Sequence, residues 1–491
     1  MLERFQLPFP MWRVCYQLNG GHRRTLPISL LVAGVVAVGV LGYQRLNQGT
    51  PIGDICAGAL STLAVVQCFV LLAGGCNTVH RALQKDYESR MIESHRLTPM
   101  TNVGVVLGYM FGAPLQLLAL AATILLCGLG LCLVGDLEPG PWVLGNLLIV
   151  VTAMPLWALV VVLGMRVGKP INPMAFLIAA GALSVPLSML PGVGLLFGIY
   201  SVGLAVAVAG GNMPPNAGAI AASGAVHVVF AAYWVVIAAT KYRRPELPAL
   251  NGWRGLALIV LWTLVGVGGV VGYETIVKRG MRTIYQNEFL TVQWVITLTS
   301  MLPIVALVCA ATAEYALLMR RGRQPRGWTD RFPDLGGVAI VAATATALAW
   351  LLGSPALSES LQADFRQVAP AGAIKEYDQN WAWAMTAAAM VCAGLSARAL
   401  MLLLPRGRDT QRRKGFLAIA VLVLWWALPP LFDQIRVVYT DGANYSGLIW
   451  GFSPPGLVIA AWSLPAIPVG SGLVVLIVTS VILTVLAARV R

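Results

Sequence analysis

Charged residues are scarce in this sequence: Asp, Glu, Lys and Arg make up only 11% of its 491 residues, whereas 58% are hydrophobic. A soluble globular protein carries about 25% charged residues, so this chain has too little polar surface for a water-soluble body of its length. The apolar residues form runs of about 18 to 25, the length with which an α-helix crosses the hydrocarbon core of a bilayer. Alternating segments of about ten residues, typical of a membrane barrel, are missing. The sequence therefore predicts an all-α, polytopic membrane protein, because backbone polar groups in lipid must be paired within helices.

Motifs for metal binding and for ATP hydrolysis are also missing. The eight cysteines and four histidines include no C-x-x-C and no Cys/His cluster, so neither a zinc site nor a disulfide framework is indicated. A P-loop needs the pattern G-x-x-x-x-G-K-[ST]. The nearest string, from Gly164 to Pro170, is one residue short and has proline in place of the hydroxyl residue. We expect no catalytic site, metal site or cofactor in this chain, so that any ATP is bound and hydrolysed by a partner.

The net charge of +14 fits a membrane topology better than nucleic-acid binding. Cytoplasmic loops of membrane proteins carry an excess of Lys and Arg. With both termini in the cytoplasm, that side holds most of the 34 basic residues, including the clusters at 320–331 and 406–414. We therefore predict a multi-pass protein of the plasma (cytoplasmic) membrane, surrounded by membrane lipids, with cytoplasmic termini and no nucleic-acid partner.

Three regions are predicted along the chain: an interfacial elbow segment over 1–25, a six-span domain over 26–245, and a second six-span domain over 246–491. The predicted spans lie near 26–43, 55–78, 104–134, 142–165, 171–189 and 216–240, and then near 255–273, 291–318, 335–353, 381–404, 415–432 and 467–488. Proline and glycine interrupt two further apolar stretches, 191–210 and 447–465, which we interpret as broken or re-entrant segments. A full crossing of 191–210 would place the basic cluster at 241–244 outside. About twelve transmembrane helices, in a 6+6 arrangement, result.

The stretch 79–103, between spans 2 and 3, carries the clearest functional signal. Apolar residues recur every four positions from Val79 to Met91 and so share one helix face, and charges of both signs cover the rest. Pro99 disfavours helix at the residue before it. The pattern predicts a short amphipathic helix over 79–99 at the membrane surface. A helix that only lies on lipid is the alternative, although such helices carry mainly Lys and Arg.

Within this stretch two acids, an Ile-Glu pair, a leucine and Thr-Pro follow one another and precede a glycine that opens the next span. They are Asp86, Glu88, Ile92, Glu93, Leu97, Thr98, Pro99 and Gly108. The arrangement resembles the first cytoplasmic loop in permease subunits of ABC-2-type transporters, and the elbow, six spans and broken segment of 1–245 resemble that family's layout. The sequence departs from the pattern at Arg90-Met91, where the family has Gly-Thr, at His95-Arg96, where it has leucines, and at Tyr109, where it has lysine.

In that family this helix is the coupling helix, which docks on a separate ATP-binding cassette subunit. The resemblance implies the membrane-spanning permease subunit of an ABC exporter, with no ATPase site of its own and an unidentified transported substrate. The implied partner-binding residues are Leu83, Asp86, Tyr87, Glu88, Met91, Ile92, Glu93, Arg96, Leu97, Thr98 and Pro99. Of these, Leu83, Tyr87, Met91 and Ile92 are expected to supply apolar contacts, and Glu88, Glu93 and Arg96 to fix the register.

Two other functions remain open on the sequence. A membrane-embedded enzyme acting on lipid-linked substrates would need acids that converge on an exterior cavity, and the candidates are Asp364, Glu376, Asp378, Asp433 and Asp441. A non-transporting membrane assembly protein would keep the ABC-2-like half without a pumping role.

Overall fold

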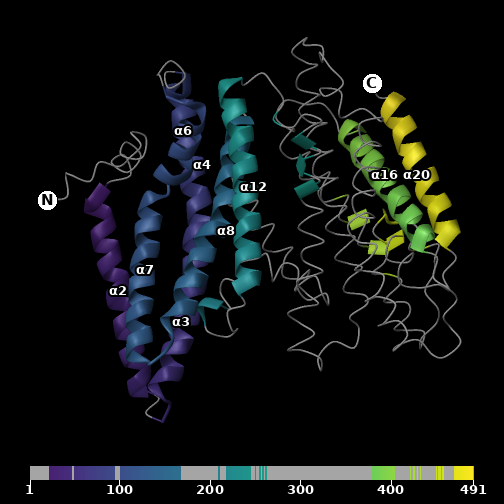
Figure 1. Ribbon diagram of the computed structural model, residues 1–491. Coiled ribbons are helices and arrows are strands. Elements are labelled where there is room, and N and C mark those ends of the chain that lie inside the picture. Colours follow the sequence, from purple (N-terminus) through teal and green to yellow (C-terminus); the bar gives the residue numbers. More distant parts are fainter. Residues whose placement is uncertain are drawn as a thin grey trace, which may run out of the picture. The chain divides into compact units, whose positions relative to one another are not determined.

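The computed structural model describes chiefly residues 21–46, 49–93, 100–166, 217–244, 379–403 and 469–489, with isolated positions elsewhere, and within them it holds helices and no strand. The chain divides into two compact units, Met1–Leu187 with Phe197–Ala249 and Ser188–Leu196 with Leu250–Arg491 (Figure 1). The main division falls a few residues after the boundary predicted at 245.

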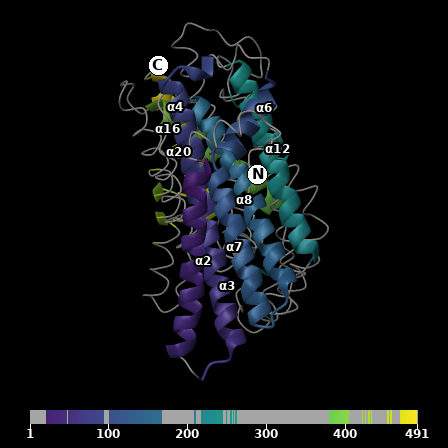
Figure 2. The same ribbon diagram turned by 90° about the vertical axis from the view of Figure 1, so that its left-hand side faces the viewer.

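The first unit contains most of the described helices. They are α2 (Gly21–Leu46), α3 (Ile52–Cys68), η2 (Phe69–Gly74), α4 (Gly75–Glu88), α6 (Asn102–Leu107), η3 (Gly108–Gly112), α7 (Leu115–Val134), α8 (Pro139–Arg166) and α12 (Ala217–Arg243), where η denotes a π-helical segment. Both α2 and α3 pack against α7, whereas α4 packs against α8 and α6 against α12. Figure 2 shows α2 at the outside of the unit. The long contact between α8 and α12 forms its interior.

Five helical segments among the described residues are long and apolar enough to cross a membrane. They are Thr25–Gly42, Ile52–Glu88, Leu115–Val134, Pro139–Met165 and Ser223–Arg243. These correspond to predicted spans 1, 2, 3, 4 and 6. Over the described residues, the prediction of an all-helical protein with several helices long and apolar enough to span a membrane is confirmed. Predicted span 5, the elbow before residue 21 and the two broken segments lie outside the described residues, apart from isolated positions.

The structure corrects the prediction for span 3, which the sequence presents as one helix over 104–134. The chain instead forms α6 and the π-segment η3, turns at Ala113 and Pro114, and then begins α7 at Leu115. Proline has no backbone N–H, and this is tolerated best where a helix begins, because the first N–H groups have no intrahelical acceptor. Pro114 occupies the N-cap position of α7.

Two helices of the second unit are described, α16 (Gln379–Leu403) and α20 (Val469–Arg489), and they pack against each other. They match the predicted spans at 381–404 and 467–488, although their apolar portions, Ala387–Leu400 and Gly470–Leu486, are shorter than a full span. A buried hydrogen bond of 3.1 Å between the hydroxyls of Ser396 and Ser480 joins them. The other four predicted spans of this half lie outside the described residues, apart from isolated positions.

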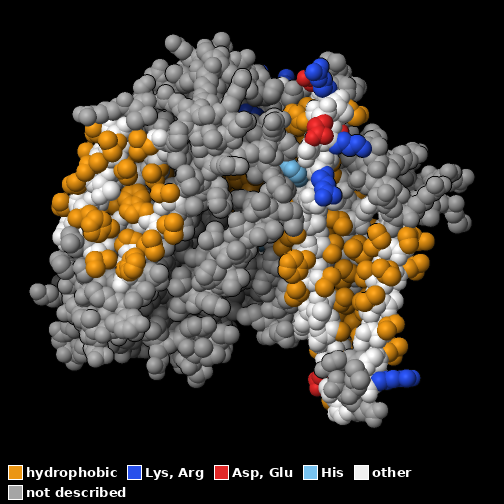
Figure 3. Space-filling model, turned by 180° about the vertical axis from the view of Figure 1, so that it is seen from behind, with side chains coloured by type: hydrophobic (Ala, Val, Ile, Leu, Met, Phe, Trp, Pro, Cys, Tyr) orange, Lys and Arg blue, Asp and Glu red, His pale blue; other side chains and the backbone are white. Residues whose placement is uncertain are grey.

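Apolar side chains face outward along these helices, as expected for contact with lipid. Leu30, Leu31 and Val38 of α2 and Val474 and Val481 of α20 are exposed. Figure 3 shows hydrophobic side chains covering the described helices on the face that it presents, with charged side chains toward the helix ends. A soluble protein rarely exposes apolar surface of this extent, so the outer surfaces agree with burial in a bilayer.

Candidate functional site

The helix that begins span 2 continues well beyond the length that a bilayer requires. It runs from Ile52 to Glu88 through α3, η2 and α4 as one segment of 37 residues. At 1.5 Å per residue such a helix is about 55 Å long, whereas the hydrocarbon core is about 30 Å thick. Arg81, Lys85 and Glu88 are exposed near its end. The last turns of α4 are therefore the part of this helix suited to an aqueous surface.

Arg90 divides the helix that the sequence predicts over 79–99. Its φ of 58° lies in the left-handed region, which ends a right-handed helix at a non-glycine residue at some energetic cost. The Lys85 carbonyl accepts two hydrogen bonds from Ser89 at the end of α4, one of 3.0 Å from the backbone N–H and one of 2.8 Å from the hydroxyl. One further helical turn follows at 91–93. The predicted site residues Arg96, Leu97, Thr98 and Pro99 lie outside the described residues.

The next helix, α6, begins with a conventional N-cap. The Thr101 hydroxyl accepts a 3.1 Å hydrogen bond from the Gly104 N–H. Threonine is a favourable N-cap residue because its side chain satisfies one of the free N–H groups of the first turn. We refer to α4, the connection after it and α6, residues 75–107, as the α4–α6 loop.

Part of the apolar face predicted to contact a partner is buried within this chain. Leu83 is fully buried and packs on Gly164 of α8, where an added Cβ would lie 2.9 Å from the Leu83 Cδ1. The Tyr87 hydroxyl donates a 3.3 Å hydrogen bond to the Met165 carbonyl of α8. Ile92 is also buried. Leu83 and Tyr87 therefore attach the α4–α6 loop to α8 of its own bundle.

The remaining predicted residues form an exposed surface of mixed charge. Glu88, Met91 and Glu93 are exposed, with 42% of the Met91 surface accessible, and Lys85 extends the surface along α4. The Glu88 carboxylate accepts a 2.8 Å hydrogen bond from the Gln84 amide one turn earlier. We call Lys85, Glu88, Met91 and Glu93 the loop surface.

Asp86 faces the interior, where it pairs with Tyr109 of η3. The Tyr109 hydroxyl, on a fully buried side chain, donates a hydrogen bond to Asp86 Oδ2. Tyr109 is one of the positions at which the sequence departs from the ABC-2-type permease pattern, which has lysine there. This bond joins the last turns of α4 to η3, the segment that follows the α4–α6 loop.

A buried tryptophan contacts both π-helical segments that flank the loop. The Trp157 indole N–H of α8 donates a 2.9 Å hydrogen bond to the Leu71 carbonyl in η2. Its ring meets the Phe111 ring of η3 edge to face, with ring centroids 6.1 Å apart. A Cβ added at Gly75 would lie only 2.3 Å from the indole nitrogen, so only glycine leaves room for this ring.

A second tryptophan of α8 repeats the arrangement at an ordinary α-helix. The Trp142 indole N–H donates a 2.9 Å hydrogen bond to the Leu125 carbonyl of α7. A Cβ added at Gly128 would lie 2.1 Å from the Trp142 ring. The sequence analysis missed both tryptophans. In the sequence, each contact appears only as a tryptophan in one apolar span and a glycine in another. This composition does not identify which two helices meet.

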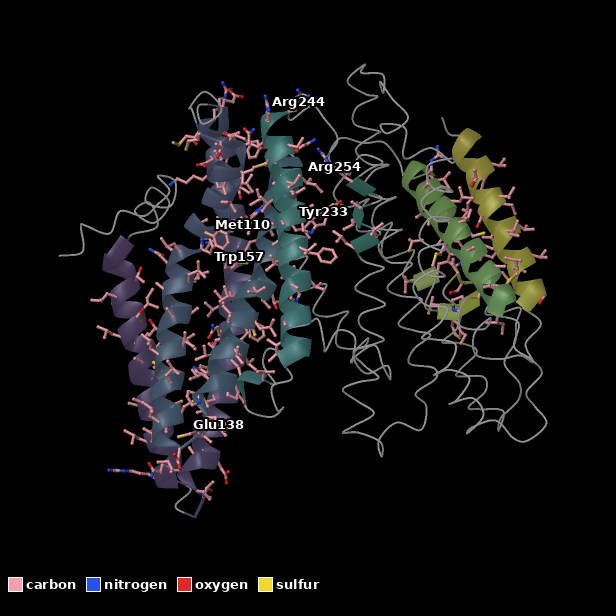
Figure 4. All side chains as sticks on the ribbon, viewed as in Figure 1. Met110, Glu138, Trp157, Tyr233, Arg244 and Arg254 are labelled. Atoms are coloured by element: carbon pink, nitrogen blue, oxygen red, sulfur yellow. The ribbon has the colours of Figure 1, made fainter. Side chains whose placement is uncertain are left out.

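The ends of the helices show which segments share a side of the first unit. The bond from Tyr87 to Met165 places the end of α4 beside the end of α8. Figure 4 shows Arg244, which follows α12, toward this same end, and Glu138, which precedes α8, at the opposite end. The basic cluster at 241–244 therefore lies on the side of the α4–α6 loop.

The part of the chain that the structure describes brings together no group of three or more His, Cys, Asp or Glu that could hold a metal ion. The five acids considered for a lipid-linked enzyme lie outside that part. Comparison of the chain with protein-family models, curated proteins and solved structures gives no match. The described residues form helices, several of them long and apolar enough to span a membrane, and the α4–α6 loop is the most distinctive polar feature among them.

Proposed function

We propose that this protein is the membrane-spanning subunit of an ATP-driven exporter, and that its separate ATP-binding cassette subunit docks on the loop surface. One observation carries the proposal. A continuous helix extends beyond the length of a bilayer span and ends at Glu88. Its last turns and the turn that follows Arg90 expose charges of both signs, Lys85, Glu88 and Glu93, beside the exposed Met91. Charges that give specificity around an apolar contact are usual in protein interfaces.

The buried contacts of the loop support a mechanical role for it. Leu83 packs on Gly164, and Tyr87 bonds to Met165, so α4 is attached to the end of α8. A force applied to the loop surface therefore acts on α8 as well as on the helix from Ile52 to Glu88. The division of roles differs from the sequence expectation: Leu83 and Tyr87 attach the loop to α8, and Met91 supplies the apolar contact with the partner.

This chain's share of the transport cycle would be to receive a movement and convert it into a change of helix packing. ATP binding and hydrolysis belong to the partner subunit, which would close on nucleotide and press on the loop surface. The direction of transport follows from the resemblance to exporter permeases, and the substrate is left unassigned.

The test is coexpression of the protein with candidate ATP-binding cassette subunits of the same genome, followed by reconstitution of the purified proteins in nanodiscs. We expect a complex whose ATPase rate exceeds that of the partner alone. Glu93→Lys and Met91→Asp should each weaken binding about tenfold, because one reverses a charge and the other introduces a charge at the interface. Both side chains are exposed, so the fold should be retained.

Glu138→Lys is the matched control, since Glu138 is an exposed acid at the opposite end of the first unit (Figure 4). It should leave binding and ATPase stimulation unchanged. The proposal fails if the wild-type protein neither binds nor stimulates the ATP-binding subunit. Binding without stimulation would instead favour the assembly protein.

A further inference from the structure

The backbone lies between two helical registers at Gly75, where η2 ends and α4 begins. In an α-helix each N–H donates to the carbonyl four residues earlier. The N–H of Gly75 is shared between three carbonyls: that of Leu71, four residues earlier, and those of Leu72 and Val70, three and five residues earlier. A hydrogen bond divided among three acceptors satisfies each of them weakly, so this turn needs support from outside the helix. π-Helical turns are rare and are frequently found at functional sites.

Trp157 supplies that support. Its indole N–H donates to the Leu71 carbonyl, one of the three acceptors that share the Gly75 N–H. The indole occupies the space that a side chain at Gly75 would need. Since the Trp157 side chain is fully buried, water cannot replace the bond at this carbonyl.

We propose that Trp157 is a positioning residue that maintains the π-helical register of η2 and thereby sets the direction in which α4 presents the loop surface. Without the indole bond, the turn can relax to the α-helical register. A shift of register by one residue rotates the following helix by about 100° and moves it by about 1.5 Å along its axis. The functional meaning of this orientation rests on the proposed docking of a partner, but the orientation itself does not.

Trp142 provides a control of the same chemistry. It belongs to the same helix, donates an indole hydrogen bond of the same 2.9 Å length to a backbone carbonyl, and also packs on a glycine. Its acceptor, Leu125, lies within the regular α-helix α7 rather than in a π-segment. Loss of either bond should lower stability, whereas only loss of the Trp157 bond should reorient α4.

The experiment measures the distance between spin labels at Ser89→Cys, after α4, and Arg244→Cys, after α12, by pulsed electron spin resonance. Both positions are exposed, and the native cysteines are replaced by alanine in this background. The protein is reconstituted in nanodiscs without any partner. Trp157→Phe keeps an aromatic ring but removes the donor, and we expect it to shift the distance distribution by about 5 Å, given a helix radius of about 5 Å with side chains. Trp142→Phe should leave the distribution unchanged.

A second pair of variants keeps the test independent of the tryptophan substitutions. Gly75→Ala and Gly128→Ala each introduce a methyl group that collides with an indole. Gly75→Ala should produce the same shift as Trp157→Phe, whereas Gly128→Ala should lower the melting temperature without a shift. The proposal is overturned if neither Trp157→Phe nor Gly75→Ala moves the labels, or if the Trp142 and Gly128 variants move them equally. Because no partner is present, failure of the wild-type protein to bind an ATP-binding subunit would refute the proposed function and leave this result unaffected.

Discussion

At the scale of single residues, the bond between Tyr109 and Asp86 joins α4, within the α4–α6 loop, to η3, the segment that follows the loop. We predict that Tyr109→Phe lowers the free energy of unfolding by about 2 kcal/mol, since hydrogen bonds to charged groups contribute about 1.5–3 kcal/mol. The measurement is unfolding of the purified protein in mixed detergent, followed by circular dichroism.

Tyr87→Phe is the comparison for this prediction. The Tyr87 hydroxyl donates to a neutral carbonyl at the longer distance of 3.3 Å, so its loss should cost about 1 kcal/mol or less. Equal losses of unfolding free energy for the two variants would contradict the prediction, because they would show that the bond from Tyr109 to Asp86 contributes no more than a bond to a neutral carbonyl.

Replacement of Gln67 is expected to increase stability rather than to lower it. Its side chain is almost fully buried, and its Oε1 has no hydrogen-bond partner within the described part of the chain. A buried acceptor without a donor costs about 1–3 kcal/mol. Gln67→Met keeps the size of the side chain and removes this acceptor, so we expect the melting temperature to rise.

Thr152 supplies the control, because its buried hydroxyl donates a 2.8 Å hydrogen bond to the Leu148 carbonyl. Thr152→Val should leave the melting temperature unchanged or lower it. A drop in the melting temperature for Gln67→Met would mean that the Gln67 oxygen is satisfied in the protein as it exists in the membrane.

At the scale of elements, the end of α4 depends on one left-handed residue. Arg90 adopts a φ of 58°, which glycine adopts without steric cost. We predict that Arg90→Gly raises the free energy of unfolding by about 0.5–1 kcal/mol and that the β-branched variant Arg90→Val lowers it by about 1 kcal/mol or more. Thermal unfolding in detergent measures both.

The neighbouring Ser89 tests whether conformation is the cause. Its φ of −83° is ordinary for an L-residue, and its hydroxyl bonds back to the Lys85 carbonyl. Ser89→Gly should therefore lower stability. If glycine at both positions changed stability in the same direction, the left-handed conformation would not explain the result.

Sequence reasoning located the helices well but not their interruptions. Long apolar runs identify α2, α3, α7, α8 and α12, since any span of hydrocarbon demands such a run. Proline was an ambiguous signal: Pro27 and Pro155 lie inside helices, whereas Pro114 marks a break. The π-segments have no period of their own in the sequence, and Arg90 carries no turn signal, because arginine is an ordinary helix former.

The exposure of the charged residues of the candidate site could be predicted from the sequence. Charges identify an exposed face directly, because a buried charge must be paired. The apolar periodicity of Leu83 and Tyr87 identified one helix face correctly, but a stripe of apolar residues does not reveal whether another protein or the chain's own helices cover it. That depends on Gly164 and Met165, which lie some 80 residues further along the chain.

At the scale of the whole molecule, the first unit makes a prediction about membrane sidedness. The end of α4 and Arg244 share one end, and Glu138 lies at the other (Figure 4). In intact cells, a membrane-impermeant maleimide should label Glu138→Cys, and should label Ser89→Cys and Arg244→Cys only after permeabilisation, if the basic clusters face the cytoplasm.

The outcome is informative even if the orientation is reversed. Ser89→Cys and Arg244→Cys must react alike, because the geometry of the first unit places them on one side. Opposite reactivity of these two positions would contradict the packing of α8 and α12 and would require the stretch at 191–210 to cross the membrane.

The two tryptophans of α8 restrict the movements open to the first unit as a whole. Trp142 and Trp157 are about four helical turns apart, and each is inserted against a glycine of a different neighbour, in α7 and in α4. Sliding of α8 along its axis would break both indole hydrogen bonds and drive both rings into backbone. Piston-like displacement is therefore the most costly motion for this bundle, and conformational change in the bilayer should proceed by tilting of whole helices.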